Sequence, residues 1–172
     1  MAEKGGKATL PGQGRLGHDD QMKAGLCVRP ARADELDSVA QVWHASASAA
    51  DDAPPQMPTV QELRARIDAE LAYGWELSVA LVGDAVVGML AVSKDERVLD
   101  ELYIAPSMQR KGVGKLLLRR AMEEMPTGFT LRTSAINVGA RAFYERMGLR
   151  LLSEGAHPRH GHPVCFYGWD VG

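Results

Sequence analysis

Residues 102–114 read LYIAPSMQRKGVG and carry three local signals in succession. Leu102 to Ile104 is an apolar run that ends at Ala105-Pro106, as a β-strand does when a proline follows. A turn containing Gly112 and Gly114 comes next, and helical periodicity follows over residues 115–125. The stretch therefore predicts a strand, a glycine-containing turn and a helix.

Such a turn can bind an anion. Glycine adopts positive φ and lets backbone approach a ligand closely, and the first N–H groups of a helix carry unpaired positive partial charge. Residues 109–114 are therefore expected to cradle a phosphate or pyrophosphate, with Arg110, Lys111 and Lys115 adding charge at the rim. The spacing fits neither a Walker loop nor a dinucleotide fingerprint. The alternative is a tight turn whose basic residues are solvated.

Helix and strand signals alternate on both sides of this stretch. Apolar spacing and a capping box at Thr59 predict helices over 36–47 and from 59 onward, separated by an irregular loop at 51–58. A last helix is expected at 140–147, with Gly148 as its left-handed C-cap. Strands are predicted at 26–29, 75–82, 85–93, 98–104, 129–133, 149–153 and 164–169. The order β-α-α-β-β-β-α-β-α-β-β indicates an α/β or α+β layered fold with one central sheet.

Size and composition fit one globular domain. The chain has 172 residues, of which 45% are hydrophobic and 24% charged, and its net charge of −2 favours neither nucleic acid nor an anionic membrane. No apolar run reaches membrane-spanning length, and no signal peptide is visible, so we expect a cytoplasmic protein. Residues 1–21 are rich in glycine and lysine and are predicted to be a disordered extension or an added leader. Residues 22–172 are expected to form the domain.

Two blocks carry a resemblance to a known family. Residues 102–114 resemble the acetyl-CoA-binding motif of the GCN5-related N-acetyltransferases (GNATs), [QR]-x-x-G-x-[GA] after a strand of the form L-Y-V-x-P. Residues 137–149, NVGARAFYERMGL, resemble the same family's N-x-x-A-x-x-F-Y-x-x-x-G-F pattern, with Leu149 in place of the final Phe. The order of elements is similar to that family from Leu26 to Trp169. The resemblance implies the GNAT fold, a mixed, mostly antiparallel sheet with helices on both faces.

The resemblance also implies a donor site. Acetyl-CoA would be the co-substrate, with its pyrophosphate on Gln109, Arg110, Lys111, Gly112, Val113, Gly114 and Lys115. Its pantetheine arm would pair with the backbone of Leu102, Tyr103 and Ile104, where one N–H would face the thioester carbonyl. Asn137 is expected to cap the last helix, to bind the pantetheine, or to do both.

The resemblance also suggests an acid in the second block and a base just before the pantetheine strand, where related polyamine acetyltransferases carry an acidic pair. Tyr144 is the expected general acid for the departing thiolate, and its alternative is a half-buried packing residue. Asp100 and Glu101 are the candidate bases, with Glu101 slightly preferred; alternation sends them to opposite faces unless a bulge intervenes. An ordered water could replace them as the base. The alternative is a pair of rim carboxylates that only attract a cation.

The acceptor is expected to be a primary amine of a small molecule. Asp51, Asp52, Asp100 and Glu101 would suit a cation such as a polyamine, an aminoglycoside or a peptide amine, bound beside the 51–58 loop. Protein N-terminal or lysine acetylation, a catalytically silent CoA-binding regulatory module and a structural domain with an empty cradle are the alternatives. The oligomeric state stays open, with a homodimer as one outcome that relatives suggest.

The remaining candidates are given structural interpretations. His157, His160 and His162 have a spacing that could suggest a metal, but they lie among Pro and Gly without an adjacent acid or thiol, so we expect a solvated connector and no metal site. The resemblance places this loop near the acceptor site, where a histidine could touch substrate. Cys27, Cys165, Trp43, Trp75 and Trp169 are expected to be packing residues.

Overall fold

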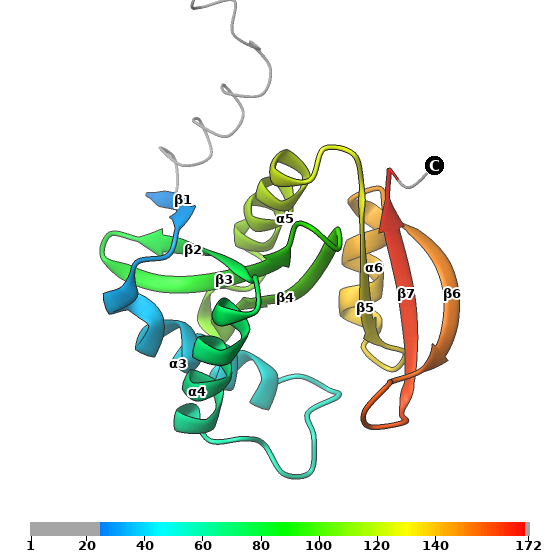
Figure 1. Cartoon of the computed structure of the whole chain (residues 1–172), viewed down its shortest axis with the longest axis horizontal. Helices are drawn as coiled ribbons and strands as arrows, with labels where there is room; N and C mark the ends of the chain where they lie inside the picture. The colour runs from blue at the N-terminus through cyan, green and yellow to red at the C-terminus, as the bar shows by residue number, and fades with distance from the viewer. Residues whose placement is uncertain (1–24, 171–172) are drawn as a thin grey trace, which may run out of the picture.

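The computed structural model describes residues 25–170, and the leader predicted at 1–21 lies outside this range. Elements are labelled as in Figure 1. The strands are β1 (Leu26–Pro30), β2 (Glu76–Val82), β3 (Ala85–Ser93), β4 (Val98–Ile104), β5 (Phe129–Ser134), β6 (Arg150–Ala156) and β7 (Pro163–Trp169). The helices are α3 (Leu36–Ser48), α4 (Val60–Ala72), α5 (Val113–Glu124) and α6 (Val138–Arg146), with 3₁₀ turns η1 (Ala33–Glu35) and η2 (Pro106–Met108).

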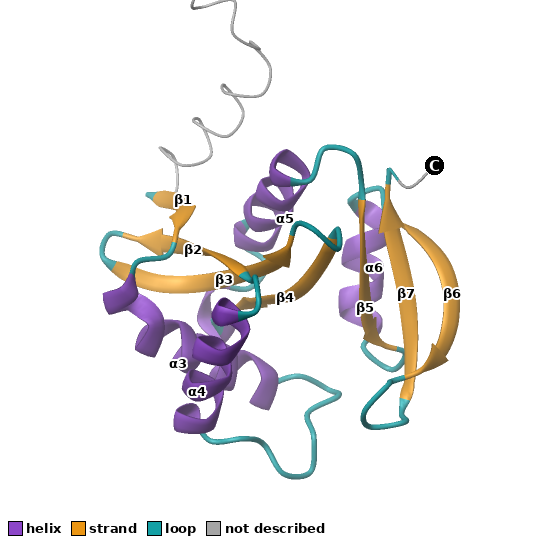
Figure 2. Cartoon of the chain, viewed as in Figure 1, coloured by secondary structure: helices purple, strands orange, loops and turns teal. Residues whose placement is uncertain are grey.

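The strands form one sheet in the order β1-β2-β3-β4-β5-β7-β6. All neighbours are antiparallel except β4 and β5, which are parallel and share the single pair Val98–Thr130. The predicted order of elements and the mostly antiparallel sheet are therefore confirmed. Figure 2 shows the helices on both sides of the strands and the long loop that joins α3 to α4.

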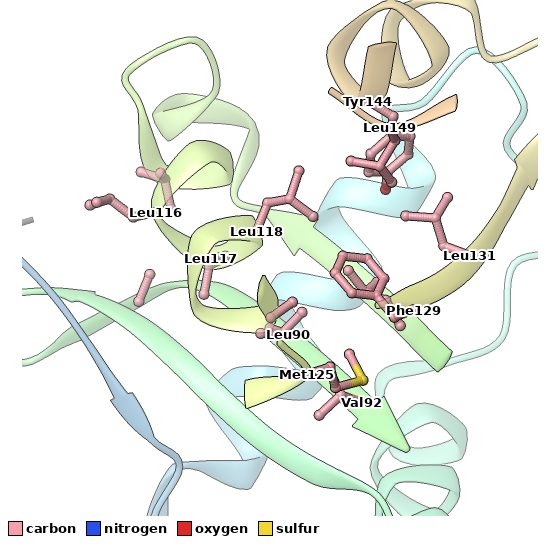
Figure 3. Packing of buried hydrophobic residues seen from close by; sticks show 14 of the residues in the cluster. Leu90, Val92, Leu116, Leu117, Leu118, Met125, Phe129, Leu131, Tyr144 and Leu149 are labelled. Carbon is pink, nitrogen blue, oxygen red and sulfur yellow. The ribbon is translucent and has the colours of Figure 1, made fainter. Parts of the chain in front are cut away.

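Two apolar clusters hold helices against opposite faces of the sheet. The α5-side cluster joins α5 and α6 to the strands and includes Leu117, Phe129 and Tyr144 (Figure 3). The α3-side cluster joins α3 and α4 to β2, β3 and β4 and includes Trp43 and Ile67. Each side chain in these clusters, once fully buried, contributes about 1.5–3 kcal/mol, so packing on both faces fixes the strands that carry the site.

Gly88 lets α5 lie close to β3. A Cβ at this position would approach Leu117 Cδ1 to 2.9 Å and Val113 Cγ1 to 3.1 Å. Because Val113 begins α5, the contact at Gly88 fixes the N-terminus of the helix relative to the sheet. The helix starts two residues before the predicted Lys115, so the last residues of the predicted turn belong to its first turn.

Several local predictions are confirmed. Gly83 and Asp84 form the two-residue connection between β2 and β3, and the Thr59 hydroxyl accepts from the Glu62 N–H at 3.1 Å in a complete capping box. Gly148 has φ +93°, as a left-handed C-cap requires. Within the described residues, no helix is long and apolar enough to cross a membrane.

The prediction for Cys27 was wrong, while Cys165 is buried as expected. Strand alternation turns Leu26 and Val28 toward the α5-side cluster and sends Cys27 to the other face. Since β1 is an edge strand, Cys27 is left exposed there. The tryptophans do pack, Trp43 and Trp75 in the α3-side cluster and Trp169 against Phe129.

Candidate active site

The sheet opens between β4 and β5. The two strands pair only at Val98–Thr130, near the start of both, and a further backbone bond joins the Thr130 N–H to the Arg97 carbonyl at 3.0 Å. Beyond these residues the strands diverge, as Figure 1 shows. One edge of β4 is therefore left without a neighbouring strand over most of its length.

Peptide groups of β4 face this opening. The Ala105 N–H donates to the Val87 carbonyl of β3 at 2.8 Å. In an antiparallel pair the hydrogen-bonding direction alternates, so the peptide groups of Leu102 and Ile104 point away from β3, toward β5. The side-chain amide of Gln109 donates to the Ile104 carbonyl at 3.3 Å. This edge can pair with an extended ligand as an added strand would.

The turn after β4 exposes the N-terminus of α5. Gly112 is the N-cap in the left-handed region with φ +89°, and Arg110 also has positive φ (+62°). The first helical hydrogen bond runs from the Leu116 N–H to the Gly112 carbonyl, so the N–H groups of Val113, Gly114 and Lys115 precede the ladder. A Cβ at Gly112 would meet no atom within 4 Å. The first N–H groups of α5 therefore have no partner in the helical ladder and the space at Gly112 is open, as the predicted anion cradle requires.

The other predicted cradle residues divide by side chain. Those of Gln109, Arg110, Lys111 and Lys115 are at least partly exposed, so their charges and amide can reach a ligand. Val113 is 1% exposed, which leaves only its N–H for binding. A Cβ at Gly114 would lie 3.3 Å from Ile104 Cδ1 and 3.4 Å from Phe143 Cζ, so a glycine there lets β4, α5 and α6 meet closely.

A β-bulge decides where the two candidate bases point. Ala91 pairs with Glu101 and Val92 with Leu99, which leaves Asp100 as an extra residue in β4. Leu99 belongs to the α5-side cluster, and in a regular strand Glu101 and Tyr103 would share its face. The extra residue instead moves Glu101 and Tyr103 to the face covered by α3 and α4.

Asp100 and Glu101 have different surroundings. The Asp100 carboxylate accepts from the Ser93 hydroxyl at 2.6 Å, and partial burial raises its pKa. Glu101 is 16% exposed, and burial raises its pKa from 4.5 to about 7, opposed by the Arg66 guanidinium and the Tyr103 hydroxyl. A pKa of about 7 at Glu101 is in the range that suits a base near neutral pH.

Tyr144 lies on α6, close enough for the charge of Glu101 to act on its hydroxyl. Its ring is 8% exposed and contacts Phe143 and Tyr167, with centroids at 5.4 and 6.1 Å. Burial raises the pKa of its hydroxyl, and the negative charge of Glu101 raises it further. The phenol therefore stays protonated and can donate. The packing role weighed for Tyr144 is thus present, and it leaves the acid role open.

Asn137 caps α6. Its side-chain oxygen accepts from the Ala140 N–H at 3.1 Å, which confirms the capping role. Its Nδ2 donates to an Asp52 carboxylate oxygen at 3.4 Å, so α6 contacts the loop between α3 and α4. Asp52 is therefore held by an amide group of the helix.

A pocket of about 490 Å³ opens between the α3–α4 loop and α4, the two segments that the sequence predicted to shape an acceptor site. It is lined by Gln56, Met57 and Pro58 of the α3–α4 loop and by Glu62, Leu63 and Arg66 of α4. Arg66 connects the pocket to Glu101, because its Nη2 lies 3.4 Å from Glu101 Oε1.

Arg66 also contacts a pair of stacked aromatic rings, Trp43 and Tyr103, through Trp43. Its Cζ is 5.0 Å from the centroid of Trp43, whose ring stacks on Tyr103 at 5.7 Å and 21°. Sequence reasoning missed Arg66 and assigned Trp43 to packing alone. Helical periodicity marks Trp43 as buried but does not tell that its ring also faces a site.

The histidine loop between β6 and β7 closes on itself. His157 Nδ1 accepts from the N–H groups of Arg159 and His160, and the His157 N–H donates to the His162 carbonyl at 2.8 Å. Burial and neighbouring positive groups lower the pKa of His157. Across residues 25–170, no group of three or more His, Cys, Asp or Glu side chains is placed to hold a metal ion.

Comparison with known proteins agrees with this geometry. The family model described as Acetyltransferase (GNAT) family matches residues 38–149, which include β4, the cradle and α6. The chain belongs to the GNAT family. Members use acetyl-CoA as co-substrate, so the resemblance in residues 102–114 and 137–149 is confirmed at the level of the family.

Individual relatives are more distant. A Mycobacterium tuberculosis protein described as probable N-acetyltransferase Rv2775 is 35% identical over 79 residues, which are 42% of this GNAT chain and 45% of that relative. The match thus spans less than half the length of the relative.

Solved structures share the fold over most of this GNAT chain. The yncA protein of Salmonella typhimurium was solved with its cofactor acetyl-CoA and has a TM-score of 0.67 at 13% identity. The match covers 86% of this chain and 94% of the yncA chain. An acetyltransferase of Thermus thermophilus has a TM-score of 0.69 at 19% identity, covering 85% and 97%. At these identities the likeness establishes the fold.

Proposed function

We propose that this GNAT protein transfers the acetyl group of acetyl-CoA to the primary amine of a small molecule by direct attack of the amine on the thioester. The observation that carries the proposal is the juxtaposition of three features. The edge of β4 is unpaired beyond Val98, the space at Gly112 is open at the start of α5, and the partly buried carboxylate of Glu101 belongs to β4 itself.

The residues present fit acetyl-CoA. The N–H groups from Val113 to Lys115 suit a pyrophosphate, and the exposed Arg110 and Lys111 supply opposing charge. The outward peptide groups of Leu102 and Ile104 suit the two amides of a pantetheine arm, which adds to the edge as a strand. Asn137 is the further candidate for a contact with that arm, through an Nδ2 that bonds Asp52 at 3.4 Å in this structure.

Acetyl-CoA supplies the acetyl group as a thioester, and the chain supplies the proton transfers. Glu101 takes the proton that the amine must lose, since a carboxylate of pKa about 7 is largely ionised just above neutral pH and still basic enough to accept it. Asp100 is engaged with Ser93 and is the less suitable base. A water held by Glu101 would serve the same purpose for an acceptor that stops short of the carboxylate.

Tyr144 donates a proton to the leaving sulfur. Its raised pKa keeps the phenol protonated, and the thiolate that forms in the same buried surroundings is a stronger base there than in water. The protons balance, because the amine gives one proton to Glu101 and CoA leaves as a thiol that carries the proton of Tyr144. The two residues then exchange protons with solvent before the next turnover.

A small acceptor fits the pocket better than a protein does. About 490 Å³ lies in the range of small-molecule sites, and the loop at 49–59 together with α4 borders it. A lysine or an N-terminus on a flexible peptide could still present its amine to the same opening, so both acceptor classes belong in the test.

The test is a panel of amines incubated with acetyl-CoA, with free thiol as the readout. The panel contains amino acids, simple alkylamines, polyamines, aminoglycosides and lysine peptides. We expect acetyl-CoA to raise the melting temperature, since a ligand of the native state stabilises it, and a small amine to release thiol above the background of hydrolysis. Absence of both effects would refute the acetyltransferase assignment, and release with peptides alone would refute the small acceptor.

A further inference from the structure

A positively charged side chain, Arg66, lines the proposed acceptor pocket. The acidic residues of the sequence had instead suggested a negatively charged pocket. Arg66 lies between the pocket and Glu101. Among the described residues, Glu62 is the one acidic residue that lines the pocket, and its carboxylate accepts from the Thr59 N–H at 2.7 Å as part of the capping box. Its charge is thus committed to the N-terminus of α4, and Arg66 is the charge that an incoming acceptor meets first.

The acidic residues expected to attract a cation lie elsewhere. Asp100 bonds Ser93 at the end of β3, and Asp52 bonds Asn137 of α6. Of these acids, Glu101 is linked to the pocket by its contact with Arg66. An acceptor with several positive charges would place one at Glu101 and bring the next against the Arg66 guanidinium, which repels it.

Arg66 is held in place yet retains donors for a ligand. The guanidinium makes a cation–π contact with Trp43, with Arg66 Cζ 5.0 Å from the centroid of the ring. Its two ionic contacts among the described residues are long, 3.4 Å to Glu101 and 3.9 Å to Glu70. A planar fork of five N–H donors with such loose partners is suited to bind a carboxylate through two parallel hydrogen bonds.

Resting on the proposed acetyl transfer, we infer that the acceptor is an α-amino acid, with its carboxylate on Arg66 and its amine at Glu101. The juxtaposition of the two side chains matches the ligand, because an α-amino acid carries its amine and its carboxylate on the same carbon atom and Arg66 Nη2 lies 3.4 Å from Glu101 Oε1. Met57, Pro58 and Leu63 line the rest of the pocket and favour an apolar side chain on that acceptor.

The experiment compares matched acceptors that differ only in the carboxylate: leucine with 3-methylbutylamine and methionine with 3-(methylthio)propylamine. We expect kcat/KM to be at least about tenfold higher for each amino acid, as one charge-assisted contact contributes roughly 1.5–3 kcal/mol. In Arg66→Met the advantage should disappear through a rise in the KM of the amino acids, so that each amino acid and its matched amine have a similar kcat/KM whatever the variant does to both. Leucinamide, which keeps the amine but lacks the negative charge, should behave as the simple amine does.

Arg64→Met is the matched control. Arg64 lies on the same helix and pairs with Asp37 and Asp68, outside the pocket lining, so its loss removes the same charge without touching the acceptor. A wild-type preference for the simple amine or a polyamine would overturn the inference, as would an unchanged preference in Arg66→Met.

A binding measurement separates this inference from the proposed function. Calorimetric titration of the CoA-saturated protein with leucine and with 3-methylbutylamine requires no turnover. Binding of leucine that is lost in Arg66→Met supports the carboxylate site even if no acetyl transfer is detected. If neither compound binds while other amines release thiol from acetyl-CoA, the acetyltransferase assignment stands and the amino-acid inference is wrong.

Discussion

The donor and acceptor sides of the opening are built differently. The donor side is one continuous segment, from the outward peptide groups of β4 to the first turn of α5, and it acts mainly through backbone groups. The proposed acceptor side draws Trp43, Arg66, Glu101 and Tyr144 from four elements, and it would act through side chains. Backbone chemistry needs a local pattern of glycines and turns, whereas side-chain chemistry depends on which elements the fold places together.

Removing the carboxylate of the acceptor side should have the largest effect. We expect Glu101→Gln to lower kcat/KM by about 10³-fold, within the range for loss of a general base. In the wild type kcat/KM should rise with pH through about 7, the pKa to which burial raises Glu101, and this limb should vanish in the variant. Initial rates between about pH 5.5 and 9 measure both.

Asp100→Asn distinguishes the two carboxylates. Because Asp100 bonds Ser93, its variant should retain most of the activity and the pH limb. The reverse pattern, with activity lost in Asp100→Asn and kept in Glu101→Gln, would assign the base to Asp100. Equal retention in both variants would favour water as the base.

Tyr144→Phe tests the other proton transfer. We expect kcat to fall by about 10²-fold with acetyl-CoA affinity nearly unchanged, since the ring and its packing on Phe143 and Tyr167 remain. Steady-state kinetics and calorimetry separate the two quantities. Tyr73→Phe removes the same hydroxyl from a tyrosine that is 89% exposed and should change neither. An unaltered kcat in Tyr144→Phe would show that the acid is another group.

A change at the donor side should act on binding instead. Gly112→Val places a branched side chain in the open space before the N–H groups of α5, and we expect acetyl-CoA to bind about 30-fold more weakly, which corresponds to one lost charge-assisted contact. Gly83→Val is matched, since Gly83 also has positive φ (+61°) and open space at its Cβ. If both variants bind acetyl-CoA as the wild type does, Gly112 does not border the phosphate site.

The buried carboxylate should also have a smaller, opposite effect on stability. Between pH 4.5 and about 7 the unfolded chain has lost a proton that Glu101 still holds when folded, so stability falls as pH rises through this window. A shift from 4.5 to about 7 amounts to roughly 3 kcal/mol above neutral pH. Glu101→Gln should therefore gain stability relative to the wild type at about pH 8 but not at about pH 4, as urea unfolding would measure. Equal differences at both pH values would contradict this.

The contrast between local backbone patterns and side chains brought together by the fold also explains which features the sequence could predict. The order of elements, the turn at Gly83, the capping box at Thr59 and the positive φ of Gly112 and Gly148 all follow from local patterns, and the structure has them. The exposure of Cys27 could not be predicted from the local sequence, because alternation of apolar residues does not reveal that β1 is an edge strand.

The acceptor side was harder to foresee. Alternation left the directions of Asp100 and Glu101 open, and only the pairing of β3 with β4 reveals the extra residue. Arg66 carries no signal in its own helix, since a charged residue on an amphipathic helix is usually solvated. Its role emerges only when α4 is packed beside Trp43 and β4.

The inserted residue gives β4 one position at which its length can change without rearranging its faces. If the codon for Asp100 were deleted, Leu99 and Glu101 would become direct neighbours and keep their present sides, because their partners Val92 and Ala91 are already consecutive in β3. Deleting Leu102 would instead rotate Tyr103 away from Trp43 and into the apolar layer under α5. A chimera that takes β4 from another protein can therefore lack the residue at position 100. After that position, the replacement strand must have the same number of residues as β4.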